Sequence, residues 1–502
     1  MPTRRISGTA TAASDPDNGG DHSGGGGSGG TFVDDVFSTY LYEGNGGSLT
    51  VTNGIDLAGE SGMVWIKQRD VRENHALTDT EQSKYLDSIS GKEMYPFMQS
   101  QSPAGLDVGG VGITEFTSTG FDLLGRAGGN EVNTDGGDFV SWTFRKAPKF
   151  FDVVTYTGDG ADSHEIPHGL GIIPGMIIVK RTDSAGDWNV VARYSDDLHM
   201  GGGQVGSFGL NSTQLATNGV LSSDRGISDK LFDASKMNGG VVDFATYVTR
   251  CNELGAEYVA YVFAHDDSDE GLIQCGGYTG TGAAGNEIDL GWEPQWVMVK
   301  SATASDKWTM YDTMRGIVTG LDGYRLWANE SSAESGYNNS IDVTSTGFKK
   351  MSALSNESGK SYIYMAIRRP NKPASEFEPE ELFAIANPQN KDPGPSFVSG
   401  FPVDMGLYTR PVAPYSNIII PRSTDTMLFS DSSSAESDAS AGFDYMNGYI
   451  SQDWQVYTPD LQAWMWRRAP GFFDVVTFRS EGSRTTEYPH NLQVAPEMVW
   501  VK

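Results

Sequence analysis

Short apolar runs, separated by Gly, Pro or Asp, recur along most of this chain. Typical examples are FDVVTYTG at 151–158, GMIIVKR at 175–181, EYVAYVFA at 257–264 and QWVMVKS at 295–301. Runs of this length that are rich in β-branched and aromatic residues predict strands. The run IIPGMIIVK at 172–180 is apolar at successive positions, as expected for a strand buried in a two-sheet sandwich. The pattern predicts an all-β protein built from antiparallel sandwich modules.

Helical periodicity is scarce in the sequence. The best candidate is LTDTEQSKYLDSI at 77–89, where Thr78 or Asp79 could cap the helix N-terminus. We therefore expect one short helix in this region and strands nearly everywhere else.

Internal repetition is the strongest organising feature of the chain. Residues 139–180 and 461–502 align without a gap, and 19 of their 42 positions are identical. A more diverged copy lies at 277–300, and a degraded one at 40–70 ends in Trp65 and Lys67. Such self-similarity indicates that one structural unit is used several times.

The repeats also share landmarks at fixed spacing. The second and third copies end in Lys180 and Lys300, and each lysine is followed at the same distance by a tryptophan, Trp188 or Trp308. The period is roughly 110 residues. The sequence predicts a Gly-rich attachment segment at 1–30 and three β modules at 31–148, 149–266 and 267–370. A Pro-rich spacer with a divergent fourth module follows at 371–470, and the start of a fifth module at 471–502. We expect the fifth module to be truncated and the chain to be part of a longer polypeptide.

The succession of motifs resembles a known kind of protein. FDVVTYTGDG, HGLGIIPGMIIVKR, a downstream Trp, a STGF strand and a YVAYVF strand are similar to repeat modules of marine bacteriophage virion proteins, and loosely to SPRY and concanavalin-like sandwiches. The resemblance covers about 31–370 and 461–502, while the fourth unit departs from it. It implies jelly-roll or concanavalin-like modules and a structural role in a virion, and it carries over no catalytic residues.

Charge and composition narrow the range of partners. The formal net charge of −29 disfavours binding to a nucleic-acid backbone. The N-terminal stretch MPTRRISGTATAAS has no apolar core of a secretory signal, and no window reaches the ~18 apolar residues of a membrane span. We expect synthesis in a host cytoplasm, no nucleic-acid partner and no membrane insertion.

Candidate catalytic and metal-binding motifs are weak. His164 and His168 are four apart but precede a strand, and the copy at 461–502 keeps only His490. A turn-stabilising role for His168 and His490 is preferred to metal binding. GKS at 359–361 lacks the glycine of a phosphate-binding loop, and the acidic run at 266–270 lacks the spacing of a calcium loop. The two cysteines form no zinc-type pair. We expect no cofactor, no metal and no enzymatic activity.

Aromatic side chains offer another kind of site. Four tryptophans could face a ligand or receptor and stack on sugars: Trp188, Trp308, Trp327 and Trp454. The recurrence of Trp188 and Trp308 after the same strand also fits a shared core position, which is the simpler interpretation.

The function predicted from these observations is that of a virion structural protein, most simply a homotrimeric tail fibre or tail appendage that contributes to host attachment. The N-terminal segment would bind other tail proteins, and the modules would act as spacers or face a host receptor or glycan. Three alternatives stay open: a carbohydrate-binding or depolymerase appendage, a capsid-decorating fibre, and a secreted adhesin. The exact location in the virion and the receptor lie beyond what the sequence indicates.

Overall fold

The computed structural model describes residues 31–502 with gaps at 89, 103, 126–131, 161–163, 165, 173, 194–204, 210–229, 232–250, 305, 318–322, 338–339, 390–393, 410–415, 439–440, 452–460, 479–486 and 502. The chain divides into two units, Met1–Thr31 and Phe32–Lys502, and the description concerns the second. The predicted attachment segment at 1–30 and the candidate Trp454 lie outside the described residues.

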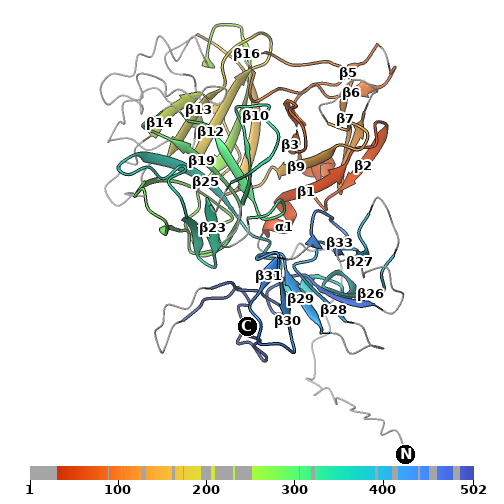
Figure 1. Ribbon diagram of the computed structural model, residues 1–502. Coiled ribbons are helices and arrows are strands. Elements are labelled where there is room, and N and C mark those ends of the chain that lie inside the picture. Colours follow the sequence, from red (N-terminus) through yellow and green to blue (C-terminus); the bar gives the residue numbers. More distant parts are fainter. Residues whose placement is uncertain are drawn as a thin grey trace, which may run out of the picture. The chain divides into compact units, whose positions relative to one another are not determined.

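The described fold is all-β, as the sequence predicts, and its sheets are antiparallel (Figure 1). The helical elements that lie wholly within the described residues are single turns: α1 Val33–Val36, α2 Leu57–Glu60, η2 Ala374–Glu376 and η3 Pro379–Glu381. The helix predicted at 77–89 is wrong. Its first residues belong to strand β4, His75–Asp79, which is buried along its whole length and pairs with β3. Backbone groups buried in this way need a partner strand, and this requirement outweighs local helical preference.

Modules 1 and 2 are defined here as residues 31–148 and 149–266. The strands of module 1 are β1 Phe37–Glu43, β2 Ser48–Thr52, β3 Gly62–Gln68, β4 His75–Asp79, β5 Tyr85–Leu86, β6 Glu93–Met94, β7 Gly112–Thr117, β8 Gly120–Leu124 and β9 Asp138–Arg145. The strands of module 2 are β10 Phe151–Thr157, β11 Ile166–Pro167, β12 Pro174–Arg181, β13 Asn189–Arg193, β14 Val205–Gly209, β15 Lys230–Leu231 and β16 Glu257–Ala264.

Modules 3 and 4 are residues 267–370 and 371–470. The strands of module 3 are β17 Ile273–Thr279, β18 Asn286–Asp289, β19 Pro294–Ser301, β20 Thr309–Asp312, β21 Gly323–Trp327, β22 Ser335–Tyr337, β23 Ile341–Thr344, β24 Gly347–Lys350 and β25 Ser361–Arg368. The strands of module 4 are β26 Phe383–Ala386, β27 Phe397–Val398, β28 Met405–Thr409, β29 Ile418–Pro421, β30 Thr426–Phe429, β31 Ser437–Asp438, β32 Ala441–Gly442, β33 Gly448–Ser451 and β34 Gln462–Trp466.

The larger sheet of every module has the same connectivity. The strand orders are β1-β9-β3-β4, β10-β16-β12-β13-β14, β17-β25-β19-β20-β21-β22 and β26-β34-β28-β29-β30-β31. In each module the first strand therefore pairs with the last, and the last pairs with the strand that carries the repeated apolar run. A smaller sheet accompanies each larger one, in the orders β2-β8-β7, β11-β15, β18-β24-β23 and β27-β33-β32. The sequence repeat is thus a repeat of one topology.

Apolar clusters fill modules 1, 3 and 4 between their two sheets. Phe121 and Val64 belong to such a cluster in module 1, Phe348 and Val299 in module 3, and Tyr449 and Met465 in module 4. Each of these clusters draws on residues of both sheets, which makes the module a sandwich with its own core.

The opposite faces of the larger sheets in modules 1 to 3 pack into one further core. Alternate residues of the last strands point into it: Val140, Trp142 and Phe144 from β9, Val259, Tyr261 and Phe263 from β16, and Ile363, Met365 and Ile367 from β25. All nine are buried. We call this cluster the shared core, because three modules contribute equivalent strand positions to it.

Aromatic rings mark the centre of the shared core. Phe144 of module 1 lies edge-to-face against Phe263 of module 2, with centroids 5.6 Å apart, and against Trp296 of module 3 at 6.3 Å. Edge-to-face contacts of this kind add to the free energy gained from burial alone. One ring therefore bridges three modules.

Residues beyond module 4 contribute no strand in their described part. Ala469 and Phe473 form an isolated bridge, and Met498–Val501 are 63–73% exposed. Their sequence counterparts, Met176–Val179, are buried in β12. The assignment of 471–502 to a fifth module remains a prediction from the sequence repeat.

The shared core predicts that modules 1 to 3 unfold together. Phe263→Ala should lower the free energy of unfolding by about 3–5 kcal/mol, as large cavities do. Because the cavity opens on all three modules, amide hydrogen exchange should accelerate in β3, β12 and β19 alike. Phe397→Ala, which creates a cavity within module 4, is the matched control and should leave those strands unchanged. Acceleration confined to β12 would contradict a shared core.

Candidate functional site

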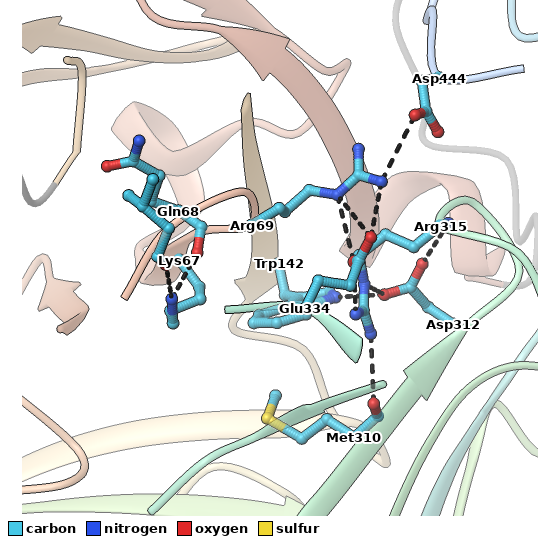
Figure 2. A network of polar contacts seen from close by, with 10 residues as sticks. Lys67, Gln68, Arg69, Trp142, Met310, Asp312, Arg315, Glu334 and Asp444 are labelled. Carbon is cyan, nitrogen blue, oxygen red and sulfur yellow. Dashed lines mark hydrogen bonds and ion pairs between the residues drawn. The ribbon is translucent and has the colours of Figure 1, made fainter. Parts of the chain in front are cut away.

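A buried network of charged residues joins module 1 to module 3 (Figure 2). Arg69, which follows β3, donates from Nη2 to Glu334 Oε1 at 2.9 Å and from Nε to Oε2 at 3.2 Å. The backbone N–H of Glu334 donates in return to the Arg69 carbonyl at 2.7 Å. Arg69 also reaches Asp444 of module 4 at 3.4 Å. One arginine of module 1 thus contacts modules 3 and 4, with its planar fork bidentate on the Glu334 carboxylate.

A second arginine completes the network from within module 3. Arg315 donates from Nη1 to Glu334 Oε2 at 2.9 Å, from Nε to Asp312 Oδ2 at 2.6 Å and from Nη2 to the Met310 carbonyl at 3.3 Å. Its guanidinium lies 5.4 Å from the centroid of the Trp142 ring. Arg315 therefore connects both carboxylates while it packs on an aromatic residue of module 1.

Trp142 adds a direct bond across the same boundary. Its indole Nε1 donates to Asp312 Oδ2 at 3.1 Å, and both side chains are fully buried. Asp312 thereby accepts one bond from module 1 and, at Oδ1, a 2.8 Å bond from the Arg315 backbone N–H. A buried carboxylate with this many donors is fully compensated for the water it has lost.

The electrostatics of the network favour its charged state. Burial by itself opposes ionisation of Glu334, but Arg315 and Arg69 outweigh it and hold the pKa of Glu334 below its ordinary value. Burial likewise opposes the charge on Arg69, yet Glu334 outweighs this effect and raises the Arg69 pKa. Both groups stay charged at neutral pH with their hydrogen-bonding capacity directed at each other. The arrangement holds modules together, and it leaves neither group available as an acid or base.

A comparable bond joins module 2 to module 1. Tyr261 Oη donates to Asp79 Oδ2 at 2.8 Å, and both residues are buried. Burial raises the Asp79 pKa to about 6, while the bond from Tyr261 acts in the opposite direction. Strand registers show that Asp79 and Asp312 occupy equivalent positions, opposite Met63 and Trp296.

Module 2 has an apolar residue in place of the carboxylate, and module 3 has an apolar residue in place of the donor. In module 2 the residue equivalent to Asp79 is Ala192, which lies opposite Met176. In module 3 the residue equivalent to Tyr261 is Met365. Where the carboxylate is missing, its donor is therefore missing as well, and both residues belong to the shared core.

His75 forms a further contact from module 1 to module 3. Its Nδ1 accepts a bond from Trp65 Nε1 at 2.9 Å, so Nε2 carries the proton and faces the carbonyls of Trp327 at 3.0 Å and Glu330 at 3.2 Å. Burial, reinforced by the positive charge of Lys67, lowers the His75 pKa to about 3. The ring is therefore a neutral structural residue.

The repeated lysines have a common role. Lys67, Lys180 and Lys300 are fully buried, and each donates to a carbonyl of the turn that follows its strand. Lys180 reaches the Gly186 carbonyl at 2.8 Å, and Lys300 reaches that of Ala304 at 3.2 Å. Burial lowers the pKa of all three to about 8. These lysines order the loop that leads to the next strand.

Trp188 and Trp308 lie directly before β13 and β20. Continued by one residue, the strand registers place them opposite Lys180 and Lys300, and His75 takes this place opposite Lys67. Trp188 is fully buried, and its Nε1 donates to the carbonyls of two module 1 residues, Gln99 and Ser102, each at 3.1 Å.

Of the four tryptophans predicted as ligand-facing residues, two are core residues here. Trp188 and Trp308 are 0% and 1% exposed and cannot contact a receptor in this conformation. Trp327 is partly exposed, with Lys307 Nζ 4.2 Å and Arg325 Cζ 5.0 Å from its ring centroid. Its ring already has cationic neighbours. The structure brings these three tryptophans to no common surface.

An ionic cluster lies at the end of module 4. Arg468 donates from Nη1 and Nη2 to Glu293 of module 3 at 2.8 and 2.7 Å, and from Nε to Asp474 at 2.7 Å. Arg369 reaches the same oxygen of Asp474 at 2.8 Å. Burial opposes ionisation of Asp474, but Arg468 and Arg369 outweigh it and hold its pKa well below the ordinary value. Modules 3 and 4 are thus tied as modules 1 and 3 are.

The remaining sequence candidates take structural positions. His168 and His490 each accept from the backbone N–H two residues later, at 3.3 and 3.2 Å, which is a turn contact. Ser361 of the GKS segment begins β25. Among the described residues, no three His, Cys, Asp or Glu side chains gather as a metal site. The helices of the described part are all too short or too polar to span a bilayer.

One open pocket lies where module 1 meets module 2. It is lined by Glu81, Lys146, Val153, Val154, Thr155, Tyr156, His164, Ile166 and Pro167. Lys146 contacts Glu81 at 3.3 Å and Asp152 at 3.1 Å. The one carboxylate in the lining is therefore already paired with a lysine, whereas a glycosidase needs two carboxyl groups that face the substrate.

Sequence reasoning did not identify Arg69, Glu334, Asp79 or Tyr261. A signal was present for Asp79, which lies twelve positions after the repeated lysine of module 1, as Asp312 does after that of module 3. No local pattern marks Arg69 or Glu334, because they are 265 residues apart in sequence.

His75 predicts a specific pH dependence. Its folded pKa is about 3, against 6.5 for an ordinary histidine, so the unfolded chain takes up a proton that the folded protein does not. Stability from this residue is complete above pH 6.5 and is lost as the pH falls. Between pH 7 and pH 5 the loss should be about 2 kcal/mol.

Urea unfolding of the wild type and His75→Gln at both pH values measures this term as a difference between the two proteins. The exposed His490→Gln is the matched control and should keep the wild-type pH dependence. An equal loss on acidification in wild type and His75→Gln would show that His75 is not buried as a neutral ring.

The network predicts a large effect of neutralising Glu334. Glu334→Gln should destabilise the protein by about 3 kcal/mol or more, because Arg69 and Arg315 remain buried without their shared carboxylate. Glu115→Gln is the matched control: Glu115 pairs with Lys84 at the surface, and its loss should cost under about 1 kcal/mol. Chemical denaturation measures the free energy of unfolding of both variants. If Glu334→Gln destabilised the protein as little as Glu115→Gln, the network would lie in a solvated interface.

Comparison with known proteins adds a family to this description. No curated protein matches the chain. A domain of unknown function, DUF7483, matches residues 33–370, which are the residues of the three modules around the shared core. The matched region thus begins at α1 and ends just after β25. Because the match spans more than half of the sequence, the chain belongs to the DUF7483 family.

Proposed function

We propose that this chain is a structural protein of a bacteriophage virion, a tail fibre or tail appendage that contributes to host attachment. The observation that carries the proposal is the use of one sandwich topology four times in succession, with the module boundaries closed by buried contacts. Repeated modules that each bury a core are an economical way to build an extended appendage.

The fate of the charged residues supports a mechanical role. Arg69 is buried and paired with Glu334 across a module boundary, and Arg315 holds Glu334 from within module 3. Arg468 is likewise paired with Glu293 across a boundary. Groups fixed in this way resist reorientation of one module against another, which suits a component that transmits force. Arg69 and Glu334 are unsuited to proton transfer, because each holds the other charged.

The sequence resemblance supplies the virion context of the proposal, and the acidic surface is compatible with it. A net charge of −29 keeps a repetitive protein soluble at high local concentration. Within the proposal, the N-terminal segment binds other tail proteins and the modules contact a host receptor or glycan.

Immunogold electron microscopy of virions that carry the protein tests the location. Antibody raised against residues 31–370 should label the tail, and antibody pre-absorbed with the purified protein is the control. Label on the capsid would replace the fibre by a head decoration. Absence of label on virions, with the antigen found in the bacterial culture, would overturn the virion assignment and favour a secreted adhesin.

A further inference from the structure

The larger sheet of module 4 has an outer face that its counterparts in modules 1 to 3 do not expose. Phe383 and Ile385 on β26 lie opposite Trp466 and Trp464 on β34, so all four side chains are on one face. Ile385 is 55% exposed and Trp464 is 36% exposed, while Phe383 and Trp466 are half-buried. We call these four residues the module 4 face. An apolar aromatic face of this kind is unusual on a sheet that stays in water.

Strand register identifies the equivalent residues of the other modules. Trp464 corresponds to Trp142, Tyr261 and Met365, which pair with β3, β12 and β19 as Trp464 pairs with β28. All three are 0% exposed. The remaining equivalents are also buried, none above 4% exposed: Phe37, Phe151 and Ile273 for Phe383, Thr39, Val153 and Cys275 for Ile385, and Phe144, Phe263 and Ile367 for Trp466.

The shared core shows what such a face packs against. In modules 1 to 3 each face is covered by the same face of two other modules, and the three together close around one cluster. Within the described residues these three faces are fully used on one another. Another copy of the chain carries a like face for module 4, and a set that reproduces the shared core has three members.

We propose that the module 4 face is a homotrimer interface, in which three chains bring their β26 and β34 strands together as modules 1 to 3 do within one chain. Identical faces related by a threefold axis form a closed assembly with no face left over. The contact buries two tryptophans per chain, and residues of this size commonly dominate interface energetics. The interface is independent of where in a virion, or outside one, the protein resides.

Light scattering coupled to size exclusion tests the interface on the full chain at micromolar concentration. The wild type should have three times the 54.2 kDa mass of one chain. Ile385→Glu/Trp464→Glu should reduce the mass threefold to that of one chain, because six carboxylates would have to share one apolar interface. Leu86→Glu/Val108→Glu is the matched control: it places the same charges on apolar residues of module 1 that are 69% and 58% exposed, and it should stay trimeric.

Oxidative footprinting of Trp464 in the wild type and in the control variant shows what else could cover the module 4 face. In the trimer Trp464 should be protected, and in the Ile385→Glu/Trp464→Glu variant circular dichroism should show an intact β fold. A monomeric wild type overturns the proposal. Protected Trp464 in that monomer would assign the cover to another segment of the same chain, and oxidised Trp464 would leave the face open. A dimer, or a trimer that survives the double substitution, equally overturns it.

Discussion

Burial of three equivalent sheet faces in one core is the constraint on which modules 1 to 3 depend. A sandwich module can fold with its outer sheet face in water, but here the outer faces of β9, β16 and β25 meet at the shared core. Polar groups carried into such a core lose their water, which costs a few kcal/mol each unless a partner replaces it. The bonds from Trp142 to Asp312 and from Tyr261 to Asp79 are consequences of that cost.

These polar bonds do more for specificity than for stability. A buried ion pair recovers little beyond the free energy spent on desolvating it, so the shared core supplies the stability. Misplacing the modules, however, would leave a carboxylate such as Asp79 buried without a donor. The observed arrangement avoids this free-energy penalty, because Tyr261 lies at Asp79 and Trp142 lies at Asp312. Met365, which has no donor, is then left for module 2, which carries Ala192 in place of the carboxylate. The arrangement of three similar modules is thereby encoded in unlike side chains at equivalent positions.

Local patterns predicted what depends on neighbours in sequence and missed what depends on distant partners. The apolar runs around 151–158 and 257–264 became β10 and β16, and the recurring Trp188 and Trp308 are core residues. The error at 77–89 arose because β3 decides the structure of β4. Trp142 and Asp312 lie 170 residues apart, and only the superposition of repeats aligns Asp312 with Asp79. The strands were therefore predictable one by one, whereas the charged network required the arrangement of modules.

Module 4 separates two features that occur together in the other modules. Its strand register places Thr409 where they have the buried lysine, and Asn417 where they have the tryptophan or histidine that faces it. Module 4 therefore lacks the buried lysine that orders the loop in the other modules. Pro421 occupies the position at which Asp79 and Asp312 accept their hydrogen bonds. Phe383, Trp464 and Trp466 nevertheless keep the large apolar side chains of the interface positions. Because the lysine orders a loop within one module and the apolar face acts between modules, a module can lose the first and keep the second. The topology therefore requires neither the lysine nor the tryptophan, since module 4 has the same strand order without them.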